Sequence, residues 1–132
     1  MKKIIVSAFF TALFVSVVFA ASMVNPLKVE VPLSLSSDAD VKKAIIAGCQ
    51  EKGWVPVEKG YNEIDASLAV RQHNVTVKIA YGKSGYSIEY KDSANMNYND
   101  KKNLIHSKYN QWVANLNKAI QQNMDYSKND GI

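Results

Sequence analysis

Three successive stretches in the middle of the chain alternate apolar and polar residues with a period of two. Residues 64–70, 75–81 and 86–90 place an apolar or aromatic residue at every second position. This alternation predicts strands with one buried and one wet face. Trp54 to Glu58 reads as a further short strand, and its Pro56 has no N–H to donate, which places it at an edge. The sequence therefore predicts a four-stranded antiparallel meander.

Helical spacing appears on both sides of this meander. The apolar positions of the first helix fall at intervals of three and four residues: Val41, Ala44, Ile45, Gly48 and Cys49. Ser37 and Asp40 form a capping box before it, and Gly53 suits its end. The last helix is predicted from about Ser107 to Asn123, with this apolar stripe: Tyr109, Trp112, Val113, Leu116, Ile120 and Met124.

The order helix, four strands, helix predicts an α+β fold. Both apolar stripes need a partner, so we expect a two-layer sandwich with both helices on one face of the sheet. A single domain should span residues 37–124. Residues 21–36 contain Pro26 and Pro32 and read as a tether or a short edge strand, and residues 125–132 should fray.

Residues 1–20 have the order of a signal peptide. Lys2 and Lys3 precede an uncharged apolar run that ends at small residues. We expect cleavage after Ala20, with a retained anchor as the alternative, because the run is close to the ~20 residues that span a bilayer. The mature chain should then have no stable membrane span. It should be exported, and soluble in the periplasm or secreted.

The net charge and the cysteine content exclude some classes of partner and of covalent cross-link. Loss of Lys2 and Lys3 with the leader lowers the 16 basic residues to 14 against 12 acidic ones, a net charge of +2. This scattered balance argues against nucleic acid as a partner. Cys49 is the only cysteine, so no disulfide forms within the chain. The preceding IIAG suggests a lipoprotein signal, but its apolar run is too short, and we expect a buried helical thiol.

Two long segments resemble a known family. VRQHNVTVKIAYGKSGYSIEYKDSANMNY and IHSKYNQWVANLNKAI are similar to segments of small uncharacterised exported bacterial proteins, many of them lipid-anchored. The resemblance covers about residues 39–120, and it implies no agreed substrate or partner. This chain lacks the cysteine that follows the leader in the lipid-anchored members. The resemblance therefore implies a soluble periplasmic form.

The sequence shows no catalytic constellation. The available bases are His73 and His106, and no nucleophile-elbow motif such as GxSxG accompanies them. We therefore expect no enzyme and no cofactor. The two histidines are 33 residues apart, and a metal site would need them to meet, with Asp92 or Asp100 completing it. We expect no metal.

Polar residues around the hairpin ends and the last helix are the candidate ligand-binding set: Arg71, His73, Tyr90, Asn97, His106 and Asn110. Tyr offers a flat apolar face, and Asn offers both a donor and an acceptor, as sugars and peptide amides require. Turn chemistry explains the Asn-rich residues 95–100 equally well. We expect a noncatalytic envelope module for protein interaction or assembly, and the alternative is a binder of a small glycan or peptidoglycan fragment.

Overall fold

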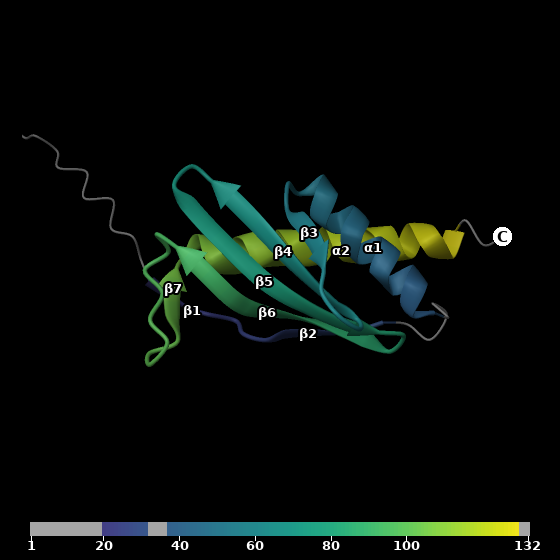
Figure 1. Ribbon diagram of the computed structural model, residues 1–132, viewed down its shortest axis with the longest axis horizontal. Helices are drawn as coiled ribbons and strands as arrows, with labels where there is room; N and C mark the ends of the chain where they lie inside the picture. Colours follow the sequence, from purple (N-terminus) through teal and green to yellow (C-terminus); the bar gives the residue numbers. More distant parts are fainter. Residues whose placement is uncertain (1–19, 32–36, 130–132) are drawn as a thin grey trace, which may run out of the picture.

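A computed structural model describes residues 20–31 and 37–129, with side chains as far as Met124 (Figure 1). In this part of the chain the elements are β1 Ala20–Ser22, β2 Leu27–Glu30, α1 Asp38–Glu51, β3 Val55–Glu58, β4 Glu63–Val70, β5 His73–Gly82, β6 Gly85–Ala94, β7 Leu104–His106 and α2 Lys108–Asn129. The predicted leader, apart from Ala20, lies outside the described residues. So do residues 130–132.

The predicted α+β class is confirmed. The main sheet is antiparallel with the order β2-β6-β5-β4-β3, and β1 pairs with β7 in a separate two-stranded sheet. The four predicted strands correspond to β3 to β6, and β3 lies at an edge, as Pro56 predicted. The sheet has five strands because β2 also pairs with β6, from Leu27 opposite Ile88 to Glu30 opposite Gly85.

Alternate residues of the strands form the core. Ile64 lies opposite Ile79, which lies opposite Ile88, and all three are fully buried. The stripes of both helices join the same cluster: Val41, Ala44, Ile45 and Cys49 from α1, and Tyr109, Val113, Leu116, Ile120 and Met124 from α2. In Figure 1, α2 passes behind the strands. Trp112 differs from the rest of its predicted stripe, because it is only partly buried at the margin of the core.

Helix α1 begins and ends where its sequence predicts. The Ser37 hydroxyl accepts the backbone N–H of Asp40 at 3.2 Å, and Gly53 follows the helix with φ 77°. Gly48 marks the closest approach to α2. A Cβ added there would lie 2.7 Å from the backbone nitrogen of Ile120, so only glycine fits between the helices.

The N-terminal segment is bound tightly to the rest of the fold. Asn110 accepts the backbone N–H of Val24 at 2.9 Å and donates to the carbonyl of Ser22 at 2.8 Å. The Met23 N–H donates to the carbonyl of Asn103 at 3.0 Å, and the Met23 side chain is buried. Residues 20–24 are therefore part of the packed domain. A three-residue strand is too short to show a periodic pattern, which is why the sequence did not predict β1 or β7.

Helix α2 extends further than its sequence pattern predicts. It continues to Asn129, past the expected end near Asn123, and its first turn contains no acidic residue. Neither α1 nor α2, as described, combines the length and the apolar character that a bilayer crossing needs.

Candidate functional site

A hollow of about 450 Å³ lies where the β4–β5 turn meets the start of α2. We call it the His hollow, and its lining residues are Val70, Arg71, His73, His106, Lys108, Gln111, Trp112 and Asn115. Figure 1 shows the β4–β5 turn, β7 and the first turns of α2 at the same end of the molecule. Three of the predicted ligand-binding residues therefore come together: Arg71, His73 and His106.

The two histidines of the hollow lie side by side. Their hydrogen bonds indicate which ring nitrogen carries the proton when each ring is neutral. Their ring centroids are 5.0 Å apart. His73 Nδ1 lies 2.7 Å from the carbonyl oxygen of Asn95, which can only accept, so Nδ1 carries the proton and Nε2 is an acceptor when the ring is neutral. His106 Nδ1 accepts the backbone N–H of Lys108 at 3.1 Å, so its proton is on Nε2.

The electrostatics of the hollow are positive. Burial lowers the pKa of His106 below its ordinary value, and the nearby His73 and Lys108 lower it further. None of the residues that line the hollow is acidic. The hollow also lies at the N-terminal end of α2, the positive end of the helix dipole.

Arg71 has an unusual backbone conformation. It occupies the two-residue turn between Val70 and His73, with φ 57° in the left-handed region. The other left-handed non-glycine residues in the described part are all asparagines, Asn62, Asn95, Asn97 and Asn103. Asparagine tolerates this conformation, whereas arginine gains nothing locally from it. None of the ion pairs in the described part of the chain involves Arg71.

Trp112 forms an apolar wall of the hollow. Its ring centroid lies 6.4 Å from that of His73, and its side chain packs partly on the core. Neighbouring Val113 and Leu116 are buried. The prediction that Trp112 belongs to the core stripe is therefore correct for only part of its surface.

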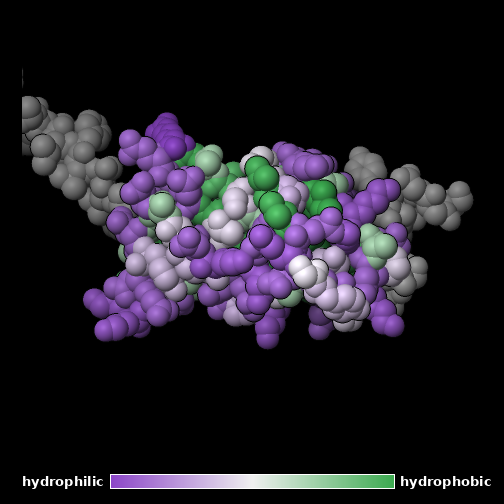
Figure 2. All heavy atoms as spheres, viewed as in Figure 1, coloured by the Kyte–Doolittle hydropathy of each residue, from purple (hydrophilic) through white to green (hydrophobic). Residues whose placement is uncertain are grey.

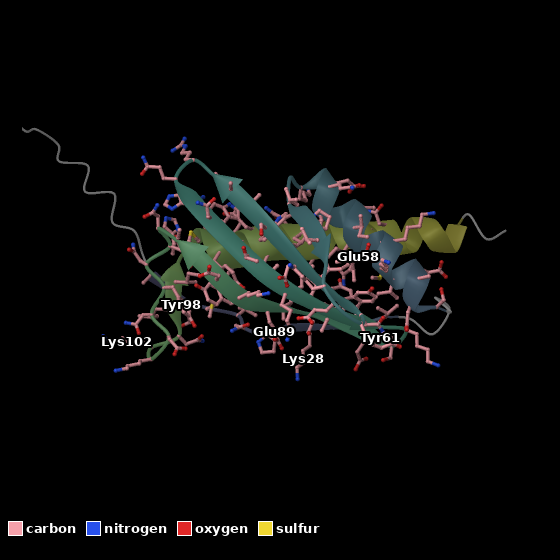
Figure 3. All side chains as sticks on the ribbon, in the orientation of Figure 1. Lys28, Glu58, Tyr61, Glu89, Tyr98 and Lys102 are labelled. Atoms are coloured by element: carbon pink, nitrogen blue, oxygen red, sulfur yellow. The ribbon has the colours of Figure 1, made fainter. Side chains whose placement is uncertain are left out.

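The other predicted ligand-binding residues, Tyr90, Asn97 and Asn110, do not line the hollow. Asn110 binds the backbone of the N-terminal segment. The ring of Tyr90 stacks on Tyr98 with centroids 4.1 Å apart, and its hydroxyl lies 2.7 Å from that of Ser93. Figure 3 shows Tyr98 at the same end of the molecule as Lys102. Asn97 is exposed and left-handed, as turn chemistry explains.

Five lining residues were absent from the predicted ligand-binding set: Val70 at the end of β4 and four residues of α2. Lys108, Gln111, Trp112 and Asn115 occupy positions 0, 3, 4 and 7 of α2 and therefore share one helical face. That spacing was readable in the sequence. The signal was obscured because Trp112 also continues the apolar stripe, and because nothing in a sequence reveals which strand turn faces the helix.

The geometry gives little support to metal binding or catalysis. The described residues contain no group of three or more His, Cys, Asp or Glu placed to hold a metal ion. The His106 proton occupies Nε2, so Nε2 could bind a metal only if the bond to Lys108 were lost. Cys49 is buried in the core, where burial raises the pKa of its thiol to about 12.

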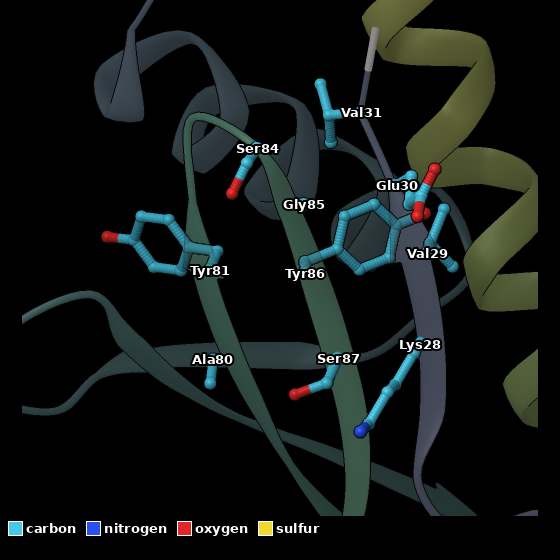
Figure 4. Close-up of a pocket in the computed structure, with 10 residues that line it drawn as sticks. All are labelled: Lys28, Val29, Glu30, Val31, Ala80, Tyr81, Ser84, Gly85, Tyr86 and Ser87. Atoms are coloured by element: carbon cyan, nitrogen blue, oxygen red, sulfur yellow. The ribbon is translucent and has the colours of Figure 1, made fainter.

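A larger hollow lies at the opposite end of the sheet, and its lining contains no histidine and no arginine among the described residues. It measures about 960 Å³ and is lined by β2 and the β5–β6 hairpin (Figure 4). Figure 4 shows the rings of Tyr81 and Tyr86 turned away from one another, with Lys28 and Glu30 on β2. Lys28 and Glu30 carry opposite charges, so the lining of this hollow has no net charge from them. Val31, which lines it, is the last described residue before the gap at 32–36.

Comparison with known proteins adds no assignment. No protein-family model, curated protein or solved structure matches the chain. The resemblance of residues 39–120 to exported bacterial proteins stays a prediction. What the protein can bind must therefore be argued from the His hollow itself, which offers two imidazoles, two unpaired cations, two amides and an indole face.

Proposed function

We propose that the protein is a noncatalytic cell-envelope protein that binds a small glycan or a peptidoglycan fragment in the His hollow. The observation that carries the proposal is the convergence of His73 and His106, 5.0 Å apart, with Arg71 at the rim. These residues come from β5, β7 and the β4–β5 turn. Each histidine uses only Nδ1 in a hydrogen bond within the fold, to Asn95 or from Lys108, and Arg71 takes part in none of the ion pairs of the described residues, so a ligand would give these groups a shared role.

The hollow has the functional groups that a sugar needs. The indole of Trp112 offers a flat apolar face on which a sugar ring can stack. Gln111 and Asn115 provide amides that donate to and accept from hydroxyl groups, and His106 Nε2 is a donor. A volume of about 450 Å³ is in the range of small-molecule sites and suits one or two sugar rings.

A binding role without catalysis agrees with the same geometry. A hydrolase needs a nucleophile or an activated water held by a base that a third group orients. In the described residues, neither histidine accepts a hydrogen bond from a Ser, Thr or Cys side chain. The hollow also lacks the carboxylates that most glycosidases use.

An export location is part of this proposal. It rests on the signal-peptide pattern of residues 1–20. Cleavage after Ala20 would remove its pairing with His106 and leave Ala21 and Ser22 paired with β7, and the proposal places the protein in the periplasm or outside the cell.

Protein interaction is a second candidate, favoured by one surface. We infer that both helices cover one face of the sheet, because their buried stripes and the buried strand residues share one core. The opposite face would then be open. Figure 2 shows hydrophobic side chains at the surface over β3, where Val55 and Val57 are 61% and 47% exposed. Tyr61, in the turn between β3 and β4, is 88% exposed, and Figure 3 labels it together with Glu58, the last residue of β3.

Nuclear magnetic resonance tests the ligand-binding proposal. Titration of ¹⁵N-labelled protein with a peptidoglycan disaccharide should shift the indole N–H of Trp112 and the amides of His73 and His106. Trp54, the other tryptophan, is buried outside the hollow and serves as an internal control that should not shift. Absence of shifts at millimolar ligand would refute the proposal.

Cross-linking in cells separates the second candidate from the first. A photoreactive residue placed at Val57 should capture a defined envelope protein if β3 is an interaction surface. The same residue at Lys83, in the β5–β6 turn, is the matched control. Recovery of uncross-linked protein from both variants would leave the second candidate without support.

A further inference from the structure

We infer that the ligand of the His hollow is an anion, and that Arg71 determines this selectivity by pairing with its carboxylate or phosphate. The inference rests on the proposed function, because it names the ligand class of the same site. It is carried by the charge of the lining and by the conformation in which Arg71 is held.

The first argument is the unbalanced charge of the lining. Arg71 and Lys108 both face a hollow that no Asp or Glu lines. Within the described residues, Lys108 makes one long hydrogen bond, 3.4 Å to Gln111, and takes part in no ion pair. Three other described lysines form ion pairs, Lys42 with Glu58, Lys78 with Glu63 and Glu89, and Lys91 with Asp65. Arg71 and Lys108 beside two imidazoles, with no acidic residue in the described lining, therefore give the hollow a positive field.

The second argument is the backbone of Arg71. A left-handed conformation is unfavourable for a residue with a long side chain, and glycine or asparagine would occupy this turn more easily. The chain places asparagine at the other such positions, Asn62, Asn95, Asn97 and Asn103. A side chain retained where the backbone disfavours it points to a role outside the fold. The guanidinium can bind a carboxylate or phosphate with two parallel hydrogen bonds.

The third argument is the donor set around the anion position. Both histidine rings line the hollow; His106 carries its proton on Nε2 and can donate it, and the Nε2 of His73 is the ring nitrogen that is not bonded to Asn95. Trp112 and Asn115 then remain for the uncharged part of the ligand. The ligand class is therefore an acidic sugar, one with a carboxylate or phosphate attached to a ring of ordinary sugar size.

Calorimetry with three sugars of the same ring tests this inference. The probes are N-acetylglucosamine, which is neutral, N-acetylmuramic acid, which carries a carboxylate, and N-acetylglucosamine 1-phosphate. We expect at least one acidic sugar to bind on the order of tenfold or more tightly than the neutral one, as charge-assisted hydrogen bonds provide. The acidic sugar that binds more tightly identifies the anion as carboxylate or phosphate.

Arg71→Gly is the decisive variant. Because glycine suits the left-handed turn, the variant should unfold at the same or a higher temperature while losing most of the preference for the acidic sugar. Lys83→Gly removes a cation from the β5–β6 turn, at the far end of β5, and should change neither. Arg71→Lys should retain part of the preference.

The outcomes separate the inference from the function on which it rests. If all three sugars bind equally, or if Arg71→Gly keeps the full preference, the hollow binds sugar but the inference is wrong. If none of the three binds and none shifts the indole resonance of Trp112, the proposed function fails as well. An acidic preference that Arg71→Gly removes and Lys83→Gly retains supports the inference.

Discussion

The contact between α1 and α2 and the His hollow follow opposite rules of residue choice. Between the helices, Gly48 leaves the space that the backbone of Ile120 fills, and both helices contribute apolar residues to the buried core. In the hollow, an arginine occupies a left-handed turn, two cations lack partners and a histidine has a lowered pKa. The first region has residues that stabilise the fold. The second retains residues that do not, which is the usual mark of a binding site.

Adjacent turns of α2 provide the strongest test of this contrast. Tyr109 is fully buried and Trp112 is partly buried against the hollow. Tyr109→Ala should lower the free energy of unfolding by about 3 to 5 kcal/mol, as large aromatic truncations in a core do. Trp112→Ala should lower it by only about 1 to 2 kcal/mol, because part of its surface is already in water. Chemical denaturation measures both, and equal losses would place Trp112 in the core.

Filling the space at Gly48 should cost less stability than truncating Tyr109, and it should have a larger effect than the changes at Arg71 and His106. A Cβ would lie 2.7 Å from the nitrogen and 2.9 Å from the Cα of Ile120, and a backbone cannot move aside as a flexible side chain can. Gly48→Ala should therefore destabilise the protein by about 1 to 3 kcal/mol, despite the better helix propensity of alanine. Ala47→Ser, on the partly exposed side of α1, is the control and should change stability by less than about 0.5 kcal/mol.

Arg71→Gly should raise the free energy of unfolding, whereas the substitutions above lower it. Relief of the left-handed strain contributes about 1 to 2 kcal/mol, and the greater freedom of glycine in the unfolded chain offsets part of this. The net expectation is a gain of about 0.5 to 1 kcal/mol in the free energy of unfolding. A loss of stability in the same denaturation experiment would show that Arg71 has a structural role.

The pH dependence of stability is the smallest expected effect. The pKa of His106 is lower in the folded protein than in the unfolded chain, so the unfolded chain binds more protons as the pH falls through the ordinary histidine value near 6.5. Stability should therefore decrease on acidification below pH ~6.5, by less in His106→Gln than in the wild type. Thermal midpoints from pH 7.5 to 5 measure this. Identical profiles for the two proteins would contradict the lowered pKa.

The sequence predicted the main sheet well because its strands are long enough to repeat their alternation. It also placed the Ser37 cap, the stop at Gly53 and the buried stripe of α1, all of which are local. It missed β1 and β7, which are three residues each and owe their pairing to side chains such as Asn110. Sequence patterns predicted the elements whose structure depends on residues close to them in the chain.

The candidate site was predicted only in part, because its residues meet through tertiary packing. Arg71, His73 and His106 were identified as polar residues near element ends, but their convergence depends on which turn faces α2. In the sequence, Asn110 and Tyr90 are also polar residues near element ends, but the structure pairs them with Val24 and Tyr98 and not with the hollow. Residue type alone does not separate an asparagine that binds backbone from one that lines a hollow.

The pKa of His106, measured by nitrogen NMR of the imidazole with and without N-acetylmuramic acid, tests the central claim most directly. A bound carboxylate stabilises the imidazolium, so the pKa should rise from its lowered value when the sugar is present. N-acetylglucosamine, which lacks the carboxylate, should leave it unchanged. If a near-saturating concentration of N-acetylmuramic acid leaves the pKa of His106 unchanged, the His hollow does not bind the anion.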